Sequence, residues 1–269
     1  MDRPLFVLTA DQDWAPEWAV EAFLDVVRRA RVPLHIFRTS PSPLLDGAAA
    51  RGDIEQGWHP NFLPGSTQGD TLEAVIGYCQ AHFPGARTVR SHCFAENSFQ
   101  WSALADAGIV ADSQGLTACQ AELTPYVHWT GIVRFPVFFE DDTFFAMKPD
   151  ALDLQAIMPT LFSPGLKILN FHPTFVACNT PSRAHYDAHR ARVFGTDAPA
   201  PSVRWTGRGT AHVFEELLGR IAEAGHRFSR LHALVDTARE ALADTPEQSA
   251  WPAFFGRRAQ SPGRAGSAV

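Results

Sequence analysis

The sequence predicts one α/β domain folded as a deformed barrel of the (β/α)7 type. Apolar strand-like runs alternate with segments of helical periodicity from the first residues to about residue 235, which favours parallel βαβ units. About seven or eight such runs suit a closed or nearly closed barrel. The 269 residues, 45% hydrophobic and 19% charged, fit a single domain of this size, and no internal repeat or linker interrupts the pattern.

The elements are expected where apolar residues recur at strand or helix spacing. Strands are expected over 5–10, 32–37, 54–60, 87–93, 109–113, 131–140, 166–173 and 230–235. Helices are expected over 16–30, 71–82, 98–108 and 184–191. Pro16 stands near the start of the first helix, and Gly108 closes the third. In such folds the chemistry lies where the strands end, at their carboxyl ends.

Composition and charge exclude several functions. The formal net charge of -6 gives no basic field for nucleic acid. The opening segment lacks a signal-peptide pattern and no apolar run is long enough for a membrane span, so we expect a cytoplasmic protein. The 4 cysteines are widely spaced, which fits reduced thiols and disfavours a cysteine zinc site. Residues 251–269, rich in Gly, Ser, Arg and Ala, are expected to form a flexible tail behind a domain of residues 1–250.

Two carboxylates follow the first expected strand. Asp11 and Asp13 are two residues apart, and side chains at this spacing in an extended chain point to the same face. One carboxylate of such a pair can bind a divalent cation while the other accepts a proton from water that the cation activates. Alternatively, Asp13 caps the next helix and Asp11 is a solvated loop acid, because acids are common at helix starts.

Histidines stand at three further strand ends. His59 ends the third expected strand, Arg90 and His92 share one face of the fourth, and His172 ends the seventh. Each histidine alone fits a structural role, although neutral imidazole is the commonest metal ligand. Four strand ends that each deliver a histidine or an acid indicate a reactive site at the barrel mouth. Other histidines need no functional role, on a polar helix face or without acidic company: His185, His189, His212, His226 and His232.

The segments TADQDW, GWHPNF, VRSHC and ILNFHP, in this order, resemble the successive motifs of the polysaccharide deacetylase superfamily, also called carbohydrate esterase family 4 or the NodB-homology family. The likeness covers residues from about 5 to 235 and implies a deformed (β/α) barrel with one divalent ion, usually zinc, bound by an aspartate and two histidines. It implies that Asp11 is the general base, and that Asp13 and His59 are metal ligands. It also implies that Arg90 holds the base in place and that His172 is the acid that protonates the leaving amine.

The sequence departs from this family pattern at the third metal ligand. The family supplies both histidine ligands from one H-x-x-x-H segment, but the residue four positions after His59 is Leu63, which cannot bind metal. His92, which replaces the proline of the family's R-x-P motif, is the candidate, with Asn61 or water as alternatives. The HPNFLPGS and RSH variants resemble a branch found among surface-polysaccharide and antigen biosynthesis proteins.

Further residues are expected to contact the substrate. Trp14, Asn61, Glu140 and Asp141 are the candidates, because each lies at or near a predicted strand end. The aromatic-rich run 135–145 and Trp129 are interpreted either as a wall against a sugar face or, for the run, as a buried strand followed by a turn. The acidic residues after the run can equally be solvated.

The function predicted from these parts is metal-dependent hydrolysis of an N-acyl group, acetyl or formyl, on an amino sugar or glycan precursor. Amide hydrolysis needs a nucleophile at neutral pH, a polarised carbonyl and a proton for the departing nitrogen, which a zinc-type ion with a separate base and acid can supply. The alternatives are a hydrolase of a small non-sugar amide and a catalytically inactive protein that binds glycan. Retention of both acids and His172 argues against the inactive protein.

Overall fold

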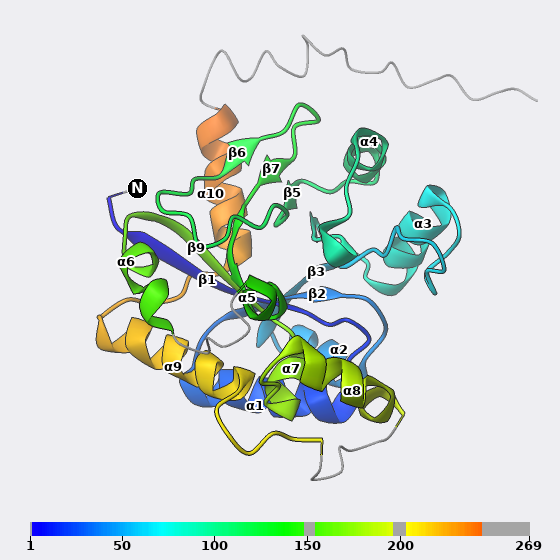
Figure 1. Ribbon diagram of the computed structural model, residues 1–269. Helices are drawn as coiled ribbons and strands as arrows, with labels where there is room; N and C mark the ends of the chain where they lie inside the picture. The colour runs from blue at the N-terminus through cyan, green and yellow to red at the C-terminus, as the bar shows by residue number, and fades with distance from the viewer. Residues whose placement is uncertain (1, 148–153, 196–202, 244–269) are drawn as a thin grey trace, which may run out of the picture.

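The protein is a single α/β domain, seen in a computed structural model that describes residues 2–147, 154–195 and 203–243 (Figure 1). Its sheet runs in the order β6-β7-β5-β4-β3-β2-β1-β9-β8, and all pairs are parallel except β6 with β7. The strands are β1 (Pro4–Asp11), β2 (Leu34–Arg38), β3 (Ile54–Trp58), β4 (Thr88–Val89), β5 (Ala111–Asp112), β6 (Tyr126–Val127), β7 (Val133–Arg134), β8 (Val137–Glu140) and β9 (Gly165–Phe171).

Helices cover the outside of this sheet and close one of its ends. Figure 1 shows α1, α7 and α9 together on one side of the sheet, with α3 and α4 beyond β3. The helices are α1 (Glu17–Ala30), α2 (Pro43–Ala50), α3 (Leu72–His82), α4 (Ser98–Asp106), α5 (Asp141–Met147), α6 (Met158–Leu161), α7 (Pro173–Cys178), α8 (Arg183–Phe194), α9 (Thr210–Glu223) and α10 (Leu231–Ala243), with 3-10 turns η1 (His92–Phe94) and η2 (Leu154–Ala156).

The sheet curls because two consecutive strands lie near its opposite edges. Strand β7 pairs with β5 near one edge, whereas β8 pairs with β9 at the other. Only Phe135 and Pro136 separate β7 from β8, and so short a link spans at most about 11 Å. The two edges must therefore approach each other, and a parallel bridge from Leu116 to Val137 joins them. This confirms the predicted deformed barrel.

Strands β1 and β9 form the centre of the core. All seven residues of β9 and the last six of β1 are buried, because the barrel interior covers one face and the helices cover the other. On the helix side, the rings of Phe23 and Phe214 stack with centroids 5.3 Å apart and join α1 to α9. The two longest strands thus give a rigid support to the residues at their carboxyl ends.

Two of the predicted strands are wrong in detail. The run 131–140 forms two strands, since Pro136 has no N–H to donate and the chain changes edge there. The run 230–235 is the start of helix α10, whose buried Leu231 and Val235 stand one helical turn apart. A short apolar run does not distinguish strand from helix, and the same spacing continues beyond the segment that suggested a strand.

The predicted strand 87–93 is shorter than expected. Only Thr88–Val89 form a strand, but Arg90 N still donates to Trp58 O at 3.0 Å and His92 N to Pro60 O at 2.9 Å. The chain therefore stays beside β3 before it turns. In the described part of the chain, no helix has the length and apolar character needed to cross a bilayer. The predicted tail, 251–269, lies outside the described residues.

Candidate active site

The predicted site residues meet at the carboxyl ends of the barrel strands. Asp11 is the last residue of β1, His59 follows β3, His92 follows β4, and His172 follows β9. Asp13 lies in the turn after β1, where its backbone has a positive φ of 46°, and Trp14 follows with a φ of 53°. This sharp turn replaces the extended chain assumed from the sequence. Both carboxylates still reach the same site.

Asp13, His59 and His92 form a compact group that we call the mouth cluster. Asp13 Oδ1 lies 3.1 Å from His59 Nε2 and 2.9 Å from His92 Nδ1. The three ligand atoms are within 4.8 Å of one another. His59 Nδ1 is buried without a hydrogen-bond partner among the described residues, so this ring is held through the nitrogen that faces the other two groups. One carboxylate oxygen and two imidazole nitrogens fit a divalent ion such as zinc.

The contacts of Asp13 exclude the helix-capping role that was considered for it. Helix α1 begins after Pro16, which has no side-chain cap, and Asp13 instead accepts hydrogen bonds from the two histidines. Burial raises the pKa of Asp13, but these two hydrogen bonds outweigh it, so the pKa lies well below its usual value. Burial lowers the pKa of His92, yet the bond to Asp13 raises it to about 10. A metal ion at His92 must therefore displace a proton at neutral pH.

Arg90 is fully buried and holds Asp11. Its Nη1 donates to Asp11 Oδ1 at 2.9 Å, while its Nε and Nη2 donate to the carbonyl and hydroxyl of Ser113 at 2.7 and 2.6 Å. Burial raises the pKa of the Asp11 carboxyl, but the charge of Arg90, with smaller contributions from His59 and His172, brings it below its ordinary value. Asp11 is therefore ionised and fixed in orientation, as a base requires.

His172 pairs with a carboxylate on the opposite side of the mouth cluster. Asp141 Oδ1 accepts from His172 Nδ1 at 2.6 Å, and Asp141 Oδ2 accepts from the backbone N–H of His172 at 2.9 Å. Burial lowers the pKa of His172, but the charge and hydrogen bond of Asp141 raise it well above its usual value. The other ring nitrogen, Nε2, lies 3.6 Å from Asp13 Oδ2 and faces the site. The geometry gives a protonated imidazole with its free N–H turned inward.

The sequence did not indicate the role of Asn170. Its Nδ2 donates to Asp11 Oδ2 at 2.8 Å and to Glu140 Oε1 at 3.1 Å, while its Oδ1 accepts from Arg90 Nη1 at 2.5 Å. Asn170 therefore fixes the second oxygen of Asp11 and links it to Glu140. Its position two residues before His172, on the same face of β9, is the only sequence signal that could have found it.

The residues that were predicted to contact the substrate do not all face the cleft. Asn61 turns into its own loop, where its side chain accepts from Leu63 N at 3.0 Å and its N–H donates to Gln68 at 2.6 Å. Glu140 and Asp141 are buried rather than solvated, and Asp141 is occupied by His172. Of the two interpretations of the run 135–145, the structure supports the buried strand, because the described rings belong to the core: Phe135, Phe138, Phe139 and Phe144.

An open cleft of about 940 Å³ gives access to the mouth cluster. Its floor contains Asp11, Asp13, His59, His92 and His172, and Glu140 also lines it. Helix α8, which was predicted as a helix with a polar face, forms one wall, and Trp14 contacts His92 edge to face with ring centroids 5.2 Å apart. The residues of α8 that line the cleft are Arg183, Tyr186, Asp187, Arg190, Ala191 and Phe194.

The deformed barrel and the residues at its mouth resemble those of the polysaccharide deacetylase class. Residues 8–190 match the sequence profile described as WbmS-like polysaccharide deacetylase. The match covers more than half of the chain, which therefore belongs to this family. The family predicted from the four motifs is confirmed.

The chain is also similar to proteins of known structure. The structure of WbmS from Bordetella bronchiseptica, described as a polysaccharide deacetylase involved in O-antigen biosynthesis, has 27% sequence identity and a TM-score of 0.71, covering 80% of this chain and 90% of that one. A polysaccharide deacetylase structure from Mycobacterium smegmatis has 16% identity, a TM-score of 0.47 and coverage of 86% and 94%. No curated protein sequence matches the chain.

Proposed function

We propose that the protein is a metal-dependent hydrolase that removes an N-acyl group, acetyl or formyl, from an amino sugar of a glycan or glycan precursor. The observation that carries the proposal is the position of the mouth cluster between a paired carboxylate and a paired imidazole. Asp11 Oδ1 lies 3.8 Å from His59 Nδ1 on one side, and His172 Nε2 lies 3.6 Å from Asp13 Oδ2 on the other. Membership of a deacetylase family supports the same reaction.

Asp13, His59 and His92 would hold one divalent ion, and their mixed oxygen and nitrogen donors favour zinc. When bound, the ion supplies Lewis-acid polarisation of the acyl carbonyl and makes water a competent nucleophile at neutral pH. His92 takes the place of the second histidine of the family's H-x-x-x-H segment. The distance of 2.9 Å between His92 Nδ1 and Asp13 Oδ1 supports a third ligand that comes from the end of β4 and not from the segment after β3.

The chain's own residues carry the protons of the reaction. Asp11, ionised by Arg90 and oriented by Asn170, accepts a proton from the attacking water. The bond between the acyl carbon and nitrogen then breaks as His172 donates its Nε2 proton to the departing nitrogen. Asp141 keeps the His172 ring protonated and turned toward the site until that step. The products are a carboxylic acid and a free amine, so one water is consumed for each amide cleaved.

The cleft has room for a sugar substrate. Its volume of about 940 Å³ lies within the range of about 300–1,000 Å³ that is usual for ligand sites. Trp14 and Glu140 remain our candidates for substrate contacts, since both line the cleft, whereas Asp141 acts through His172. The likeness to a protein of O-antigen biosynthesis, at 27% identity, supports a glycan precursor as the substrate class.

The test is acyl release by protein of defined metal content. Metal-free protein, prepared with a chelator, should release neither acetate nor formate from N-acyl amino sugars, and one equivalent of zinc should restore release. Release from simple non-sugar amides alone would favour the small-amide hydrolase. Glycan binding without any acyl release, with or without zinc, would indicate an inactive glycan-binding protein and contradict the proposal.

A further inference from the structure

Helix α8 presents one continuous face to the catalytic cleft. Its lining residues recur every three or four positions, which places them on one stripe of the helix. Val193 packs with Cys178 of α7 in a small buried cluster, and this contact fixes the helix beside the cleft. None of the residues on the stripe takes part in the proposed proton transfers. They are Arg183, Tyr186, Asp187, Arg190, Ala191 and Phe194.

Tyr186 brings this face over the reactive groups. Its ring stacks on Phe175 with centroids 4.6 Å apart, and Phe175 in turn lies 5.6 Å from the His172 ring. Burial raises the pKa of Tyr186, while the nearby charge of Arg190 lowers it and that of Asp13 raises it. Arg190 stands one helical turn beyond Tyr186, about 6 Å along the axis. A group bound at Arg190 would therefore lie about one sugar ring away from the reactive groups.

Arg190 is the unpaired positive charge of this face. Arg183 Nε donates to Asp187 Oδ1 at 2.9 Å, so the acid that stands three residues before Arg190 already has a partner. Arg190 is exposed, and it has no hydrogen bond or ion pair with any of the described residues. A guanidinium is always charged, and it forms two parallel hydrogen bonds with a carboxylate or a phosphate. An oxyanion on the substrate is the partner that suits it.

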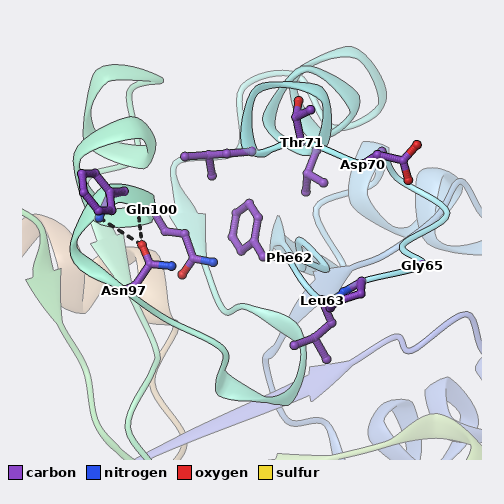
Figure 2. Close-up of a pocket in the computed structure, with 12 residues that line it drawn as sticks. Phe62, Leu63, Gly65, Asp70, Thr71, Asn97 and Gln100 are labelled. Carbon is purple, nitrogen blue, oxygen red and sulfur yellow. Dashed lines mark hydrogen bonds between the residues drawn. The ribbon is translucent and has the colours of Figure 1, made fainter.

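A second groove, between the segment after β3 and the start of α4, has a different character (Figure 2). It shares no lining residue with the catalytic cleft. Among the described residues that line this groove, only Asp70 carries a charge, and Figure 2 shows its carboxylate turned away from Phe62. The second groove therefore has no positive group for an anion, whereas the catalytic cleft has Arg190.

We propose that the N-acyl sugar in the cleft carries a negatively charged group, a carboxylate or a phosphate, which Arg190 binds. The helical spacing from Tyr186 to Arg190 suits an oxyanion on the reacting sugar itself, either a ring carboxylate or a phosphate at the anomeric carbon. The inference rests on the proposed function and deepens it, since it makes the substrate an anionic amino sugar. A neutral amino sugar would leave Arg190 without a partner.

Kinetics with the zinc-loaded protein test the inference. The wild type should deacetylate N-acetylglucosaminuronic acid or N-acetylglucosamine 1-phosphate with a kcat/KM at least about tenfold higher than N-acetylglucosamine. The better of the two anionic substrates identifies the charged group as a carboxylate or a phosphate. Arg190→Gln should remove most of this advantage, mainly by raising KM, and should leave the rate on the neutral sugar within about twofold.

The matched control is Arg192→Gln, on the same helix but outside the lining of the cleft. This variant loses the same charge and should keep the preference for the anionic substrate. Equal kcat/KM for all three sugars in the wild type, or a preference that survives in Arg190→Gln, would overturn the inference.

Binding separates the failure of this inference from failure of the proposed function. Glucuronate, glucose 1-phosphate and glucose carry no acyl group, so their binding by calorimetry does not depend on turnover. The wild type should bind at least one of the two anions about fivefold more tightly than glucose, and Arg190→Gln should remove this difference. Anions that bind no more tightly than glucose, or that bind equally well to Arg190→Gln, would show that Arg190 receives no oxyanion, whether or not the cleft releases acetate.

Discussion

Two histidine–carboxylate clusters lie at opposite ends of the same barrel. The mouth cluster follows the carboxyl ends of the strands, and a second group, which we call the base cluster, is formed by His35, Glu55 and His232 near their amino ends. Each offers three ligand atoms within 4.8 Å of one another. Residue type and spacing therefore do not separate a metal site from a structural site in this molecule.

Most polar groups of the base cluster have partners within the fold, although His232 Nε2 is buried without a hydrogen-bond partner among the described residues. Glu55 Oε2 accepts from the backbone N–H of His232 at 3.1 Å and so anchors the start of helix α10 to strand β3. His35 lies 3.4 Å from Glu55 through Nδ1 and 3.0 Å from the Thr88 hydroxyl through Nε2. Burial lowers the pKa of His35 to about 4, although the Glu55 carboxylate opposes this shift. These groups hold the helix against the barrel.

The mouth cluster differs in access and in the groups around it. Its three residues line an open cleft, and a charged acceptor and a charged donor stand on its two sides, at Asp11 and His172. The base cluster is instead covered by helix α10, with Arg230 Nη1 4.0 Å from Glu55 Oε1. Access and flanking charge, rather than ligand type, distinguish the two ends.

The largest expected effect comes from removing Asp11, the proposed general base. Asp11→Asn should lower kcat by about 10²–10⁴-fold, because the amide cannot accept the proton from water. Zinc content, measured by elemental analysis, should stay at the wild-type level, since Asp11 is not one of the three ligands. A variant with near wild-type turnover would refute the assignment and direct attention to Glu140, which also lines the cleft.

The next effect concerns the acid on the other side of the mouth. His172→Ala should cut amide turnover by about a hundredfold while leaving folding and zinc content almost unchanged. The loss should be much smaller for an activated aryl ester, whose leaving group needs no proton. An equal loss on amide and ester, or a large fall in melting temperature with normal specific activity, would show that His172 is structural.

The base cluster should respond in the opposite way. Glu55→Ala leaves the His232 N–H and the His35 ring without their acceptor, so the free energy of unfolding should fall by about 1–3 kcal/mol. Zinc content and kcat of the folded fraction should not change. Glu21→Ala, on the exposed face of α1, is the matched control and should leave stability unaltered. Loss of zinc in the Glu55 variant would contradict a purely structural base cluster.

The smallest expected effect is a shift in the pH profile. Turnover needs protonated His172, so the rate falls as pH rises through the pKa of this residue. Burial lowers that pKa and Asp141 raises it above its usual value. Asp141→Asn removes the raising charge, and the alkaline limb of the kcat profile should therefore move to lower pH. An unmoved limb would show that another group controls it.

Much of the candidate site could be predicted because its residues follow recognisable strands. Asp11, Asp13, His59 and His172 each stand at the end of an apolar run, and parallel strands bring such ends together. The partners of these residues could not be predicted in the same way. Asp141 meets His172 across a separation of 31 residues, and Asn170 meets Asp11 across 159, contacts that depend on which strands become neighbours.

The barrel's lower end was harder to predict for a similar reason. The run 230–235 suggests a strand, and His232 meets Glu55 only when α10 packs against the barrel. The closure of the sheet also depends on a change of edge at Pro136, which an apolar run does not reveal. The local sequence pattern predicted most strands and helices, but not which sheet edges would meet or which helix would cover the amino ends of the strands.

The most direct test of the account is the stoichiometry and location of bound zinc. Metal-free wild-type protein and the His232→Gln variant should each bind one equivalent of zinc in a calorimetric titration, and the His92→Gln variant should lose this tight binding. All three proteins should be shown to be folded by circular dichroism before titration. Two equivalents in the wild type, or zinc that is retained by His92→Gln and lost from His232→Gln, would contradict the claim that the mouth cluster alone is the metal site.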